Sequence, residues 1–350
     1  MEAPKLTTGI ATAALMAGIV GGGGLSAGAA GAETLRVANW LPPSHPIVRD
    51  MVQPWAANVE EATEGRVTVD ILDAPLGPPP AHFDMAADGI ADVTFGVHGY
   101  TPGRFTLTQM VEVPFLGDSA EALSVAYWRV HEEHLAEANE HEGVQVLGVF
   151  THGPGHIFNT VQPVEAVEDL DGMKLRVGGG IVSQVADLLN VVTVPAPSTE
   201  TYELLSNGVA DGILFPHESV PFFNLEGVLE YGTIVPGGLY NTSFFFVMNA
   251  DRFDALSAED QEAIMSVSGE DFSRMAGRAW DEADAAGLEA IEEAGIEMIT
   301  ASDAMIDSLR ETLSPVEEGL VESMNEAGVD GGAALEMFRA EVEAYEPGTE

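Results

Sequence analysis

The order strand, helix, strand near the start of the chain constrains its fold most. Residues 34–40 form an apolar run typical of a buried strand, and residues 66–72 alternate as a second strand. Between them, apolar residues at 47–63 have helical spacing, and Gly65 ends the helix. This order is typical of a βαβ unit, in which the helix lets the second strand run parallel to the first. The sequence therefore predicts an α/β protein.

The same pattern continues beyond this unit. Strands are expected at residues 91–96, 144–150, 173–177, 191–194, 212–215, 240–249 and 296–299, and helices at residues 82–88, 120–139, 181–189, 199–207, 258–294 and 302–345. A loop at residues 151–156 opens a second α/β unit, so two lobes with a helical C-terminal third are predicted. We expect lobe I at residues 33–152 plus 242–281, and lobe II at residues 153–241 plus 282–350.

Residues 1–32 are predicted to be a secretory signal peptide, cleaved near Ala32 and Glu33. Lys5 precedes an uncharged stretch that is rich in Gly and Ala and ends in small residues. A membrane anchor is the alternative, because the stretch exceeds the roughly 20 residues that span a bilayer. Its few large apolar residues favour cleavage. We therefore expect a soluble exported protein.

The composition excludes several kinds of function. The chain has 57 acidic and 13 basic residues, a net charge of -44 and no cysteine. Binding to nucleic acid or anionic membranes needs clustered Lys and Arg, so neither is expected. Without cysteine there are no disulfides and no thiolate chemistry. The acidic residues are spread along the chain, which favours an acidic, salt-adapted (halophilic) surface, with an ordinary acidic exported protein as the alternative.

Catalytic signatures are missing or misplaced, so no enzyme activity is expected. The one Gly-x-Ser-x-Gly sequence lies at residues 24–28, in the predicted leader. Residues 131–134, His-Glu-Glu-His, lack the i, i+4 spacing of a zinc helix and are interpreted as a solvated acidic face. We expect no metal or cofactor. A secreted hydrolase is an alternative that would require a nucleophile–base pair or a metal cluster.

Two basic residues stand out in this acidic chain. Lys174 and Arg176 occupy alternate positions of a short strand that runs into Gly178-Gly179-Gly180, and Lys174 is the only lysine after the leader. The glycines allow close backbone approach, and the next helix presents its amino end there. Arginine binds carboxylates bidentately, so Arg176 is predicted to hold the carboxylate of a small ligand. An ion pair with an acidic side chain is the alternative.

Three segments of the chain resemble the substrate-binding proteins of tripartite ATP-independent periplasmic (TRAP) transporters, the C4-dicarboxylate-receptor-like family. They are residues 170–177 (Leu-Asp-Gly-Met-Lys-Leu-Arg-Val), residues 202–212 and the strand ending at Asn249. The resemblance runs from the leader to the C-terminal helices. It implies a two-lobed periplasmic-binding-protein fold (type II-like) with a long connecting helix, which delivers an organic acid to membrane permease subunits. Arg176 matches the arginine that pairs with the ligand carboxylate in this family. A receptor of the ABC type is the alternative.

The sequence departs from the family at residues 211–216, which read Asp-Gly-Ile-Leu-Phe-Pro where many members have Asp-Gly-Gln-Glu-Asn-Pro. Phe215 thus stands where an amide contacts the ligand, and His156 stands near the place of a second arginine. The resemblance with these departures predicts an aromatic or other monocarboxylate, with histidines recognising ring hydroxyls, and argues against a dicarboxylate or sialic acid. The predicted ligand-binding residues are Arg176, His156, His152, Phe215, Asn39, Trp40, His98, Tyr100, Ser198, Thr199 and Asn241. We expect a monomer.

Overall fold

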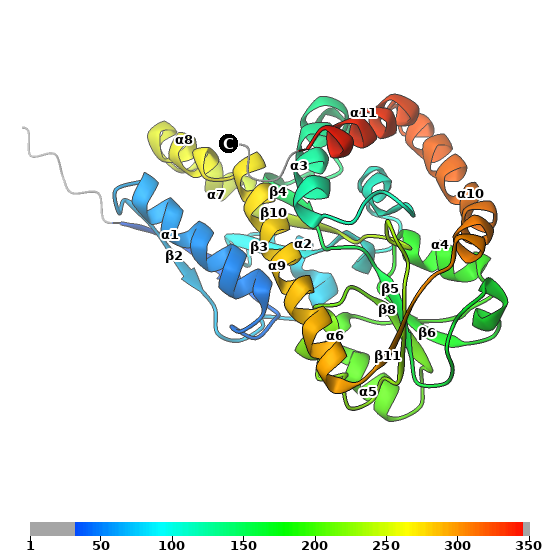
Figure 1. Ribbon diagram of the computed structural model, residues 1–350. Helices are drawn as coiled ribbons and strands as arrows, with labels where there is room; N and C mark the ends of the chain where they lie inside the picture. Colours follow the sequence, from blue (N-terminus) through cyan, green and yellow to red (C-terminus); the bar gives the residue numbers. More distant parts are fainter. Residues whose placement is uncertain (1–31, 346–350) are drawn as a thin grey trace, which may run out of the picture. The chain divides into compact units, whose positions relative to one another are not determined.

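The computed structural model describes residues 32–345, so the predicted signal peptide lies outside the described residues. Helices and strands alternate over this range (Figure 1). No helix within residues 32–345 combines the length and apolarity needed to cross a bilayer. The predicted α/β class is confirmed, with two separate sheets.

Sheet A contains the first predicted βαβ unit. Its strands are β1 (Glu33–Ala38), β2 (Val67–Ile71), β3 (Val93–Val97), β4 (Val144–Thr151) and β10 (Ser243–Asn249), in the order β2-β1-β3-β10-β4. β1 runs parallel to β2 and β3, as predicted. β10 returns from the later part of the chain and pairs antiparallel with both β3 and β4.

Sheet B carries the strand with Arg176. Its strands are β5 (His156–Asn159), β6 (Lys174–Val177), β7 (Val192–Pro195), β8 (Gly212–Phe215), β9 (Tyr231–Ile234) and β11 (Glu297–Thr300), in the order β11-β9-β5-β8-β6-β7. The expected loop at residues 151–156 ends where β5 begins, and neither β5 nor β9 was predicted. β5 reads His-Ile-Phe-Asn and β9 reads Tyr-Gly-Thr-Ile, so neither forms an apolar run or a strict alternation.

The α-helices are α1 (Gln53–Ala62), α2 (His82–Ala87), α3 (Ala120–Val130), α4 (Ile181–Leu188), α5 (Thr201–Ser206), α6 (Ser219–Phe222), α7 (Ala250–Asp254), α8 (Ala258–Ser266), α9 (Glu270–Ala294), α10 (Asp303–Glu326) and α11 (Gly331–Ala344). Most α-helices agree with the predicted positions, but α6 and α7 were not predicted, and π-helix replaces α-helix at Ile47–Val52 and His131–Leu135. Glycine also divides two of the predicted helices. The single helix predicted at 258–294 is two helices, because Gly269 has φ 63°. Likewise Gly328, with φ 87°, ends the helix predicted at 302–345 early.

Polar side chains fix where several of these helices begin. Ser119, Ser257, Ser302 and Asp330 each accept a hydrogen bond from a backbone N–H in the first turn of α3, α8, α10 and α11. Such caps satisfy donors that have no partner within the helix and contribute about 1 kcal/mol each. The starts of α3, α8, α10 and α11 are therefore encoded locally.

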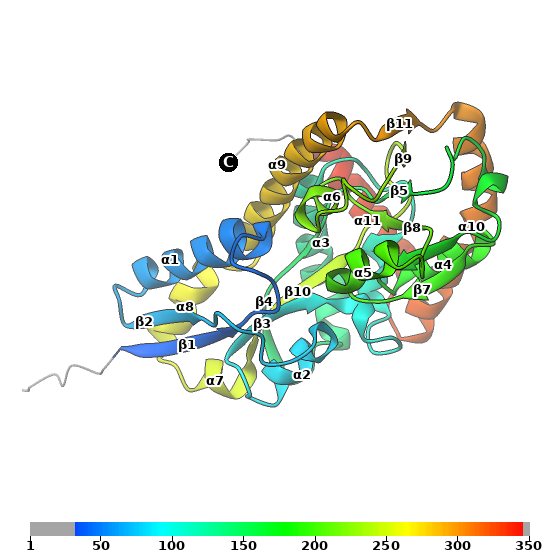
Figure 2. The ribbon, with the colours of Figure 1, turned by 90° about the horizontal axis from the view of Figure 1, so that it is seen from below.

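Helix α9 connects the surroundings of the two sheets. It packs against α3 and β4 along its first part and against α6 further on (Figures 1 and 2). Two glycines allow close approach: a Cβ on Gly277 would lie 2.5 Å from the Ala120 carbonyl oxygen, and one on Gly287 would lie 2.6 Å from the backbone nitrogen of Glu218. The long connecting helix predicted from the resemblance is thus present.

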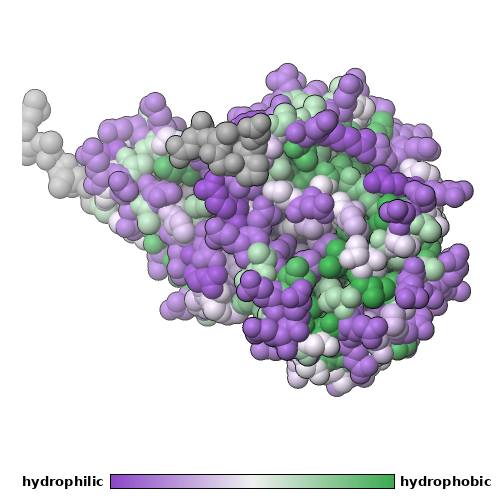
Figure 3. Space-filling model, in the orientation of Figure 1, coloured by the Kyte–Doolittle hydropathy of each residue, from purple (hydrophilic) through white to green (hydrophobic). Residues whose placement is uncertain are grey.

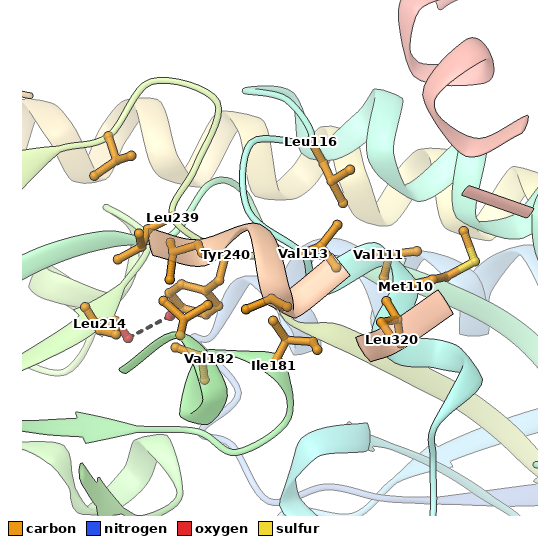
Figure 4. Close-up of a cluster of buried hydrophobic side chains, with 14 of the residues drawn as sticks. Met110, Val111, Val113, Leu116, Ile181, Val182, Leu214, Leu239, Tyr240 and Leu320 are labelled. Atoms are coloured by element: carbon orange, nitrogen blue, oxygen red, sulfur yellow. Dashed lines mark hydrogen bonds between the residues drawn. The ribbon is translucent and has the colours of Figure 1, made fainter. Parts of the chain in front are cut away.

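An apolar cluster joins residues from the two sheets' surroundings. Ile181 and Val182 of α4 lie beside Leu239 and Tyr240, which precede β10 (Figure 4). The Tyr240 hydroxyl donates a 2.7 Å hydrogen bond to the carbonyl oxygen of Leu214 in β8. The segment that leads into β10 of sheet A is therefore anchored to sheet B.

Candidate functional site

A cavity with an empty volume of about 480 Å³, its opening to solvent included, lies between segments of both sheets. Trp40 follows β1 and Tyr100 follows β3, whereas Arg176 and Phe215 belong to β6 and β8. Its aromatic lining consists of Trp40, Tyr100, Phe215, Phe223, Tyr240, Phe244 and Trp280, and its polar lining includes His45, His152, Arg176, Ser198, Ser219 and Thr242. The site lies at the carboxyl ends of strands, where open α/β sheets bind ligands.

Arg176 is the one arginine that is both buried and without a carboxylate partner among residues 32–345. Every other arginine of this range except the exposed Arg310 has a carboxylate oxygen within 4.0 Å. Only 2% of Arg176 is exposed. The chain has 57 acidic residues, so Arg176 does not lack a carboxylate partner because acidic side chains are scarce. The predicted alternative, a structural ion pair, is therefore absent from the described part of the chain.

The guanidinium of Arg176 is held by the protein on one side only. Nε and Nη2 donate to the carbonyl oxygen of Ala196 at 2.9 and 2.6 Å, and the group lies 4.7 Å from the Phe215 ring centre. Nη1 has no hydrogen-bond partner among the described residues. A Cβ on Gly178 would lie 3.5 Å from Nη2 and 3.7 Å from the Tyr100 ring, so the absence of a side chain there leaves room between these groups.

Two contacts near Arg176 join the surroundings of sheets A and B. The Tyr100 hydroxyl accepts a 2.9 Å hydrogen bond from the backbone N–H of Ser198, which leaves its own proton available to another acceptor. The backbones of Gly99 and Gly179 also meet, since a Cβ on Gly99 would lie 2.8 Å from the Gly179 carbonyl carbon. The structure therefore has the two sides of the cavity in contact.

His152 lines the cavity as a neutral imidazole. Its Nδ1 is hydrogen-bonded to the carbonyl oxygen of Gly153. Burial lowers its pKa to about 4, and nearby Arg176 contributes in the same direction. Rings of Tyr240, Phe244 and Trp280 surround it, with centroid distances of 5.6, 6.1 and 6.0 Å.

His45 lines another part of the cavity, beside buried acids. Its Nδ1 accepts a 3.1 Å hydrogen bond from the Ile47 N–H, and its Nε2 lies 3.7 Å from Glu218 Oε1. Burial lowers the His45 pKa to about 3 and raises the Glu218 pKa to about 8. Asp284, whose pKa burial raises to about 7, accepts a 2.8 Å bond from the Glu218 N–H. At neutral pH the His45 ring is therefore uncharged.

The structure brings together six of the predicted site residues and leaves five outside the cavity lining. The lining includes Arg176, His152, Phe215, Trp40, Tyr100 and Ser198. It does not include His156, Asn39, His98, Thr199 or Asn241. Four of these five residues are held by other contacts or lie in another part of the surface.

Internal hydrogen bonds occupy three of the excluded side chains. His98 contacts Ser243 Oγ at 3.2 Å and His141 Nε2 at 2.8 Å. His156 accepts from the Val235 N–H at 3.2 Å. The Asn39 amide bonds both backbone groups of Leu41, which turns the chain after β1.

Thr199 lies in a different surface hollow, with Pro42 and Tyr202. Asn241 is buried, and neither the nitrogen nor the oxygen of its side-chain amide has a hydrogen-bond partner among the described residues.

Several lining residues were not among the predicted ligand-binding residues. Trp280 belongs to α9, where aromatic residues usually indicate only a buried face, and Phe223 directly follows α6. His45 offered a usable signal, because it follows a strand just as His98 and His152 do. Among residues 32–345, no group of three or more His, Cys, Asp or Glu side chains is placed to hold a metal ion.

The fold and site define a solute-binding protein. A small cavity with aromatic walls and one buried cation, Arg176, lies between segments of the two β-sheets. Residues 37–323 match the family described as bacterial extracellular solute-binding protein, family 7. The chain belongs to this family, the substrate-binding proteins of TRAP transporters. These are periplasmic transport receptors, not enzymes, and their role implies membrane permease subunits as partners.

Similar proteins agree with this assignment. A TRAP periplasmic solute-binding protein from Bordetella bronchiseptica, with bound (R)- and (S)-mandelate, has a TM-score of 0.87 and 42% identity over 89% of this chain and 98% of that chain. One from Rhodoferax ferrireducens T118, with copurified benzoate, has a TM-score of 0.83 and 28% identity over 89% and 97%. The "outer membrane transporter protein TsaT" of Comamonas testosteroni is 31% identical over 89% of this chain and 92% of its own length. The chain is thus a TRAP receptor for a small organic acid.

Proposed function

We propose that the ligand is an aromatic monocarboxylic acid, with its carboxylate on Arg176 and its ring between the aromatic walls of the cavity. The observation that carries this proposal is the buried, unpaired guanidinium beside the Phe215 ring. A buried charge without a partner is costly, and a ligand carboxylate supplies the missing counter-ion. Mandelate and benzoate, bound by the two similar structures, are acids of this class.

The groups around Arg176 suit a single carboxylate. Nη1 and Nη2 form the planar fork that meets a carboxylate with two parallel hydrogen bonds. The Tyr100 hydroxyl, which accepts from Ser198, keeps a proton to donate to the same group. Trp40 and Phe215 supply the apolar walls on which an aromatic ring packs.

A second carboxylate would find no full charge in this lining. The remaining basic side chains among the described lining residues are His45 and His152, with pKa values lowered by burial to about 3 and about 4. Both are neutral in the physiological range. We therefore propose that dicarboxylates bind weakly, since one carboxylate would be desolvated without a counter-ion.

Ligand titration followed by tryptophan fluorescence tests the proposal, because Trp40 and Trp280 line the cavity. Benzoate, mandelate, pyruvate and succinate are titrated separately into the mature protein. Saturable responses to the aromatic acids at the lowest concentrations are expected. Tight succinate or pyruvate binding with no response to either aromatic acid would contradict the proposal.

We propose the following organisation for the mature receptor. The signal peptide is cleaved near Ala32 and Glu33, and intact-mass analysis of exported protein tests this. The lobes are residues 33–152 plus 242–281 and residues 153–241 plus 282–350, which is supported by the division of strands between sheets A and B. Helix α11 is an exception, because it falls within the range assigned to lobe II but packs against α3 of lobe I. The receptor acts as a monomer, which light scattering tests.

We also propose that the surface is adapted to salt. The net charge of -44 is the main support. Hydrophilic side chains cover much of the face shown in Figure 3, with smaller apolar areas among them. Repulsion between acidic side chains weakens as salt screens it.

A further inference from the structure

We infer that His152 selects ligands that carry a hydroxyl group, by accepting a hydrogen bond from that hydroxyl on Nε2. The inference rests on the proposed function, since it concerns the same cavity and takes the ligand carboxylate to lie on Arg176. It narrows aromatic monocarboxylates to hydroxylated ones.

The position of the proton on His152 follows from its contacts. Nδ1 faces the Gly153 carbonyl oxygen, which can only accept, so Nδ1 carries the hydrogen. The ring is neutral, because burial lowers its pKa to about 4. A neutral imidazole has a single proton, so Nε2 presents a lone pair and no hydrogen.

That lone pair has no protein donor among residues 32–345. The hydrogen bond to Gly153 is the only one of this side chain to another described residue, and His152 is 5% exposed. The rings of Tyr240 and Phe244 stand on edge to it, at interplanar angles of 87° and 68°. A ligand that fills the cavity displaces the water that could donate to Nε2, so a ligand without a donor would leave this acceptor unpaired at a cost in free energy.

His45 shows that this property is particular to His152. At His45, the Ile47 N–H donates to Nδ1, so the ring proton lies on Nε2 and faces Glu218 Oε1 at 3.7 Å. At 3.7 Å this contact is too long for a hydrogen bond, but the proton on Nε2 makes that atom of His45 a donor and leaves it no lone pair for a ligand hydroxyl. His152 is oriented at one nitrogen only and leaves an acceptor for the ligand.

An acceptor of this kind discriminates between closely similar ligands. Hydroxyl groups can donate to Nε2, whereas an ether, a ketone or a second carboxylate presents only lone pairs and is repelled. A site built to bond a ligand hydroxyl strongly rejects analogues that lack it, because its buried polar group is then left unpaired. The expected preference is about tenfold or more.

Matched ligand series test the inference by calorimetry. One series is 3-hydroxybenzoate, 3-methoxybenzoate and benzoate; the other is mandelate, O-methylmandelate and phenylacetate. In at least one series the hydroxylated acid should bind about tenfold or more tightly than both analogues. Similar affinities within both series would overturn the inference and leave the proposed function standing. Failure of every aromatic acid to bind would instead contradict the proposed function.

Variants connect the preference to His152. His152→Phe keeps a ring but no acceptor, and its hydroxyl preference should fall to about twofold or less. His152→Gln offers an amide oxygen as an acceptor and should retain part of the preference. The control is His131→Phe, the same change at a buried histidine 5.6 Å from the His141 ring and outside the cavity lining. A full preference in His152→Phe would overturn the inference, and if that variant does not fold, the ligand series on the wild-type protein still tests it.

Discussion

The backbone N–H of Ile181 donates a 3.0 Å hydrogen bond to Glu112 Oε2. Ile181 begins α4, which follows β6 of sheet B. The other oxygen of Glu112 accepts from the N–H and the hydroxyl of Ser243, the first residue of β10 in sheet A, at 3.0 and 2.7 Å. One buried carboxylate therefore joins the surroundings of the two sheets, close to the cavity. No sequence pattern indicated this role for Glu112.

Glu112→Gln should weaken ligand binding. The amide offers one oxygen and places hydrogens toward an N–H donor, so one of these contacts becomes a clash of donors at a cost of about 1–3 kcal/mol. Affinity measured by calorimetry should fall about tenfold, together with thermal stability. The control is Glu140→Gln, which removes a carboxylate bonded to the N–H groups of Thr106 and Leu107, outside the cavity. If Glu140→Gln reduced affinity equally, the Glu112 contact would have no specific part in binding.

Arg176→Lys should bind ligand much less tightly although the charge is kept, because an ammonium group cannot form the bidentate pair. Arg176→Ala should lose more, about 2–5 kcal/mol of binding free energy. Calorimetry with benzoate or mandelate measures both. Lys174→Ala is the matched control, since Lys174 is exposed on the same strand. Wild-type affinity in Arg176→Lys would show that Arg176 is structural.

Gly99→Ala should hinder closure of the lobes around the ligand. A Cβ at this position would lie 2.8 Å from the carbonyl carbon of Gly179 and 3.0 Å from the nitrogen of Gly180, both backbone atoms that cannot rotate away. Small-angle scattering of wild-type protein should show a smaller radius of gyration with ligand, and the variant a smaller decrease. Gly227→Ala, with no atom within 4 Å of its added Cβ, should behave as wild type.

Stability should be greatest near pH 6.5. Burial raises the pKa of three carboxyl groups above the ordinary values of 4.5 for Glu and 3.8 for Asp: Glu112 (about 7), Asp284 (about 7) and Glu218 (about 8). These groups therefore stabilise the fold most at low pH, and this contribution is lost as the pH rises toward 8. Histidines act in the opposite direction, because burial lowers their pKa values below 6.5 and the unfolded chain takes up protons first as pH falls. They are the buried His45, His82, His98, His131, His141, His152 and His156 and the half-buried His217.

Thermal unfolding at one fixed high salt concentration measures this profile. The melting temperature should fall steeply below pH 6, where the histidines dominate, and more gently between pH 7 and pH 8.5. Glu112→Gln should reduce the alkaline part of the slope. A melting temperature that rises steadily from pH 6.5 to pH 8.5 is incompatible with the raised carboxyl pKa values.

Added NaCl should raise the melting temperature of the ligand-free receptor. The net charge of -44 produces repulsion that salt screens within a Debye length of about 10 Å at 0.1 M. Sucrose at matched osmolality is the control, because it does not screen charge. Equal effects of NaCl and sucrose would show that charge repulsion is not the cause.

Local patterns predicted most helices and strands and the candidate cation. Strands such as β2 and β4 alternate or form apolar runs, and caps such as Ser257 fix helix starts, so their signals lie within a few residues. Arg176 was conspicuous because basic residues are so rare in this chain. These features depend on neighbours in sequence.

The sequence did not predict which of several similar residues would line the cavity, because this depends on partners that are distant in sequence. His98 and His152 both follow strands of sheet A, yet only His152 lines the cavity. His98 is held by His141, 43 positions away, and by Ser243, 145 positions away. Trp280 reaches the cavity from a long amphipathic helix, and the helical pattern gives no sign of which buried residue meets a ligand.

Strand β10 fills the gap between β3 and β4, although the chain reaches it only after β5 to β9. During synthesis, the facing edges of β3 and β4 therefore remain unpaired until residue 249 has emerged. Contacts this distant in sequence form slowly, and unpaired strand edges attract other chains in the meantime. Sheet A, begun first, is thus completed late, so a nascent chain stays incompletely folded over most of its length while it is being made and exported.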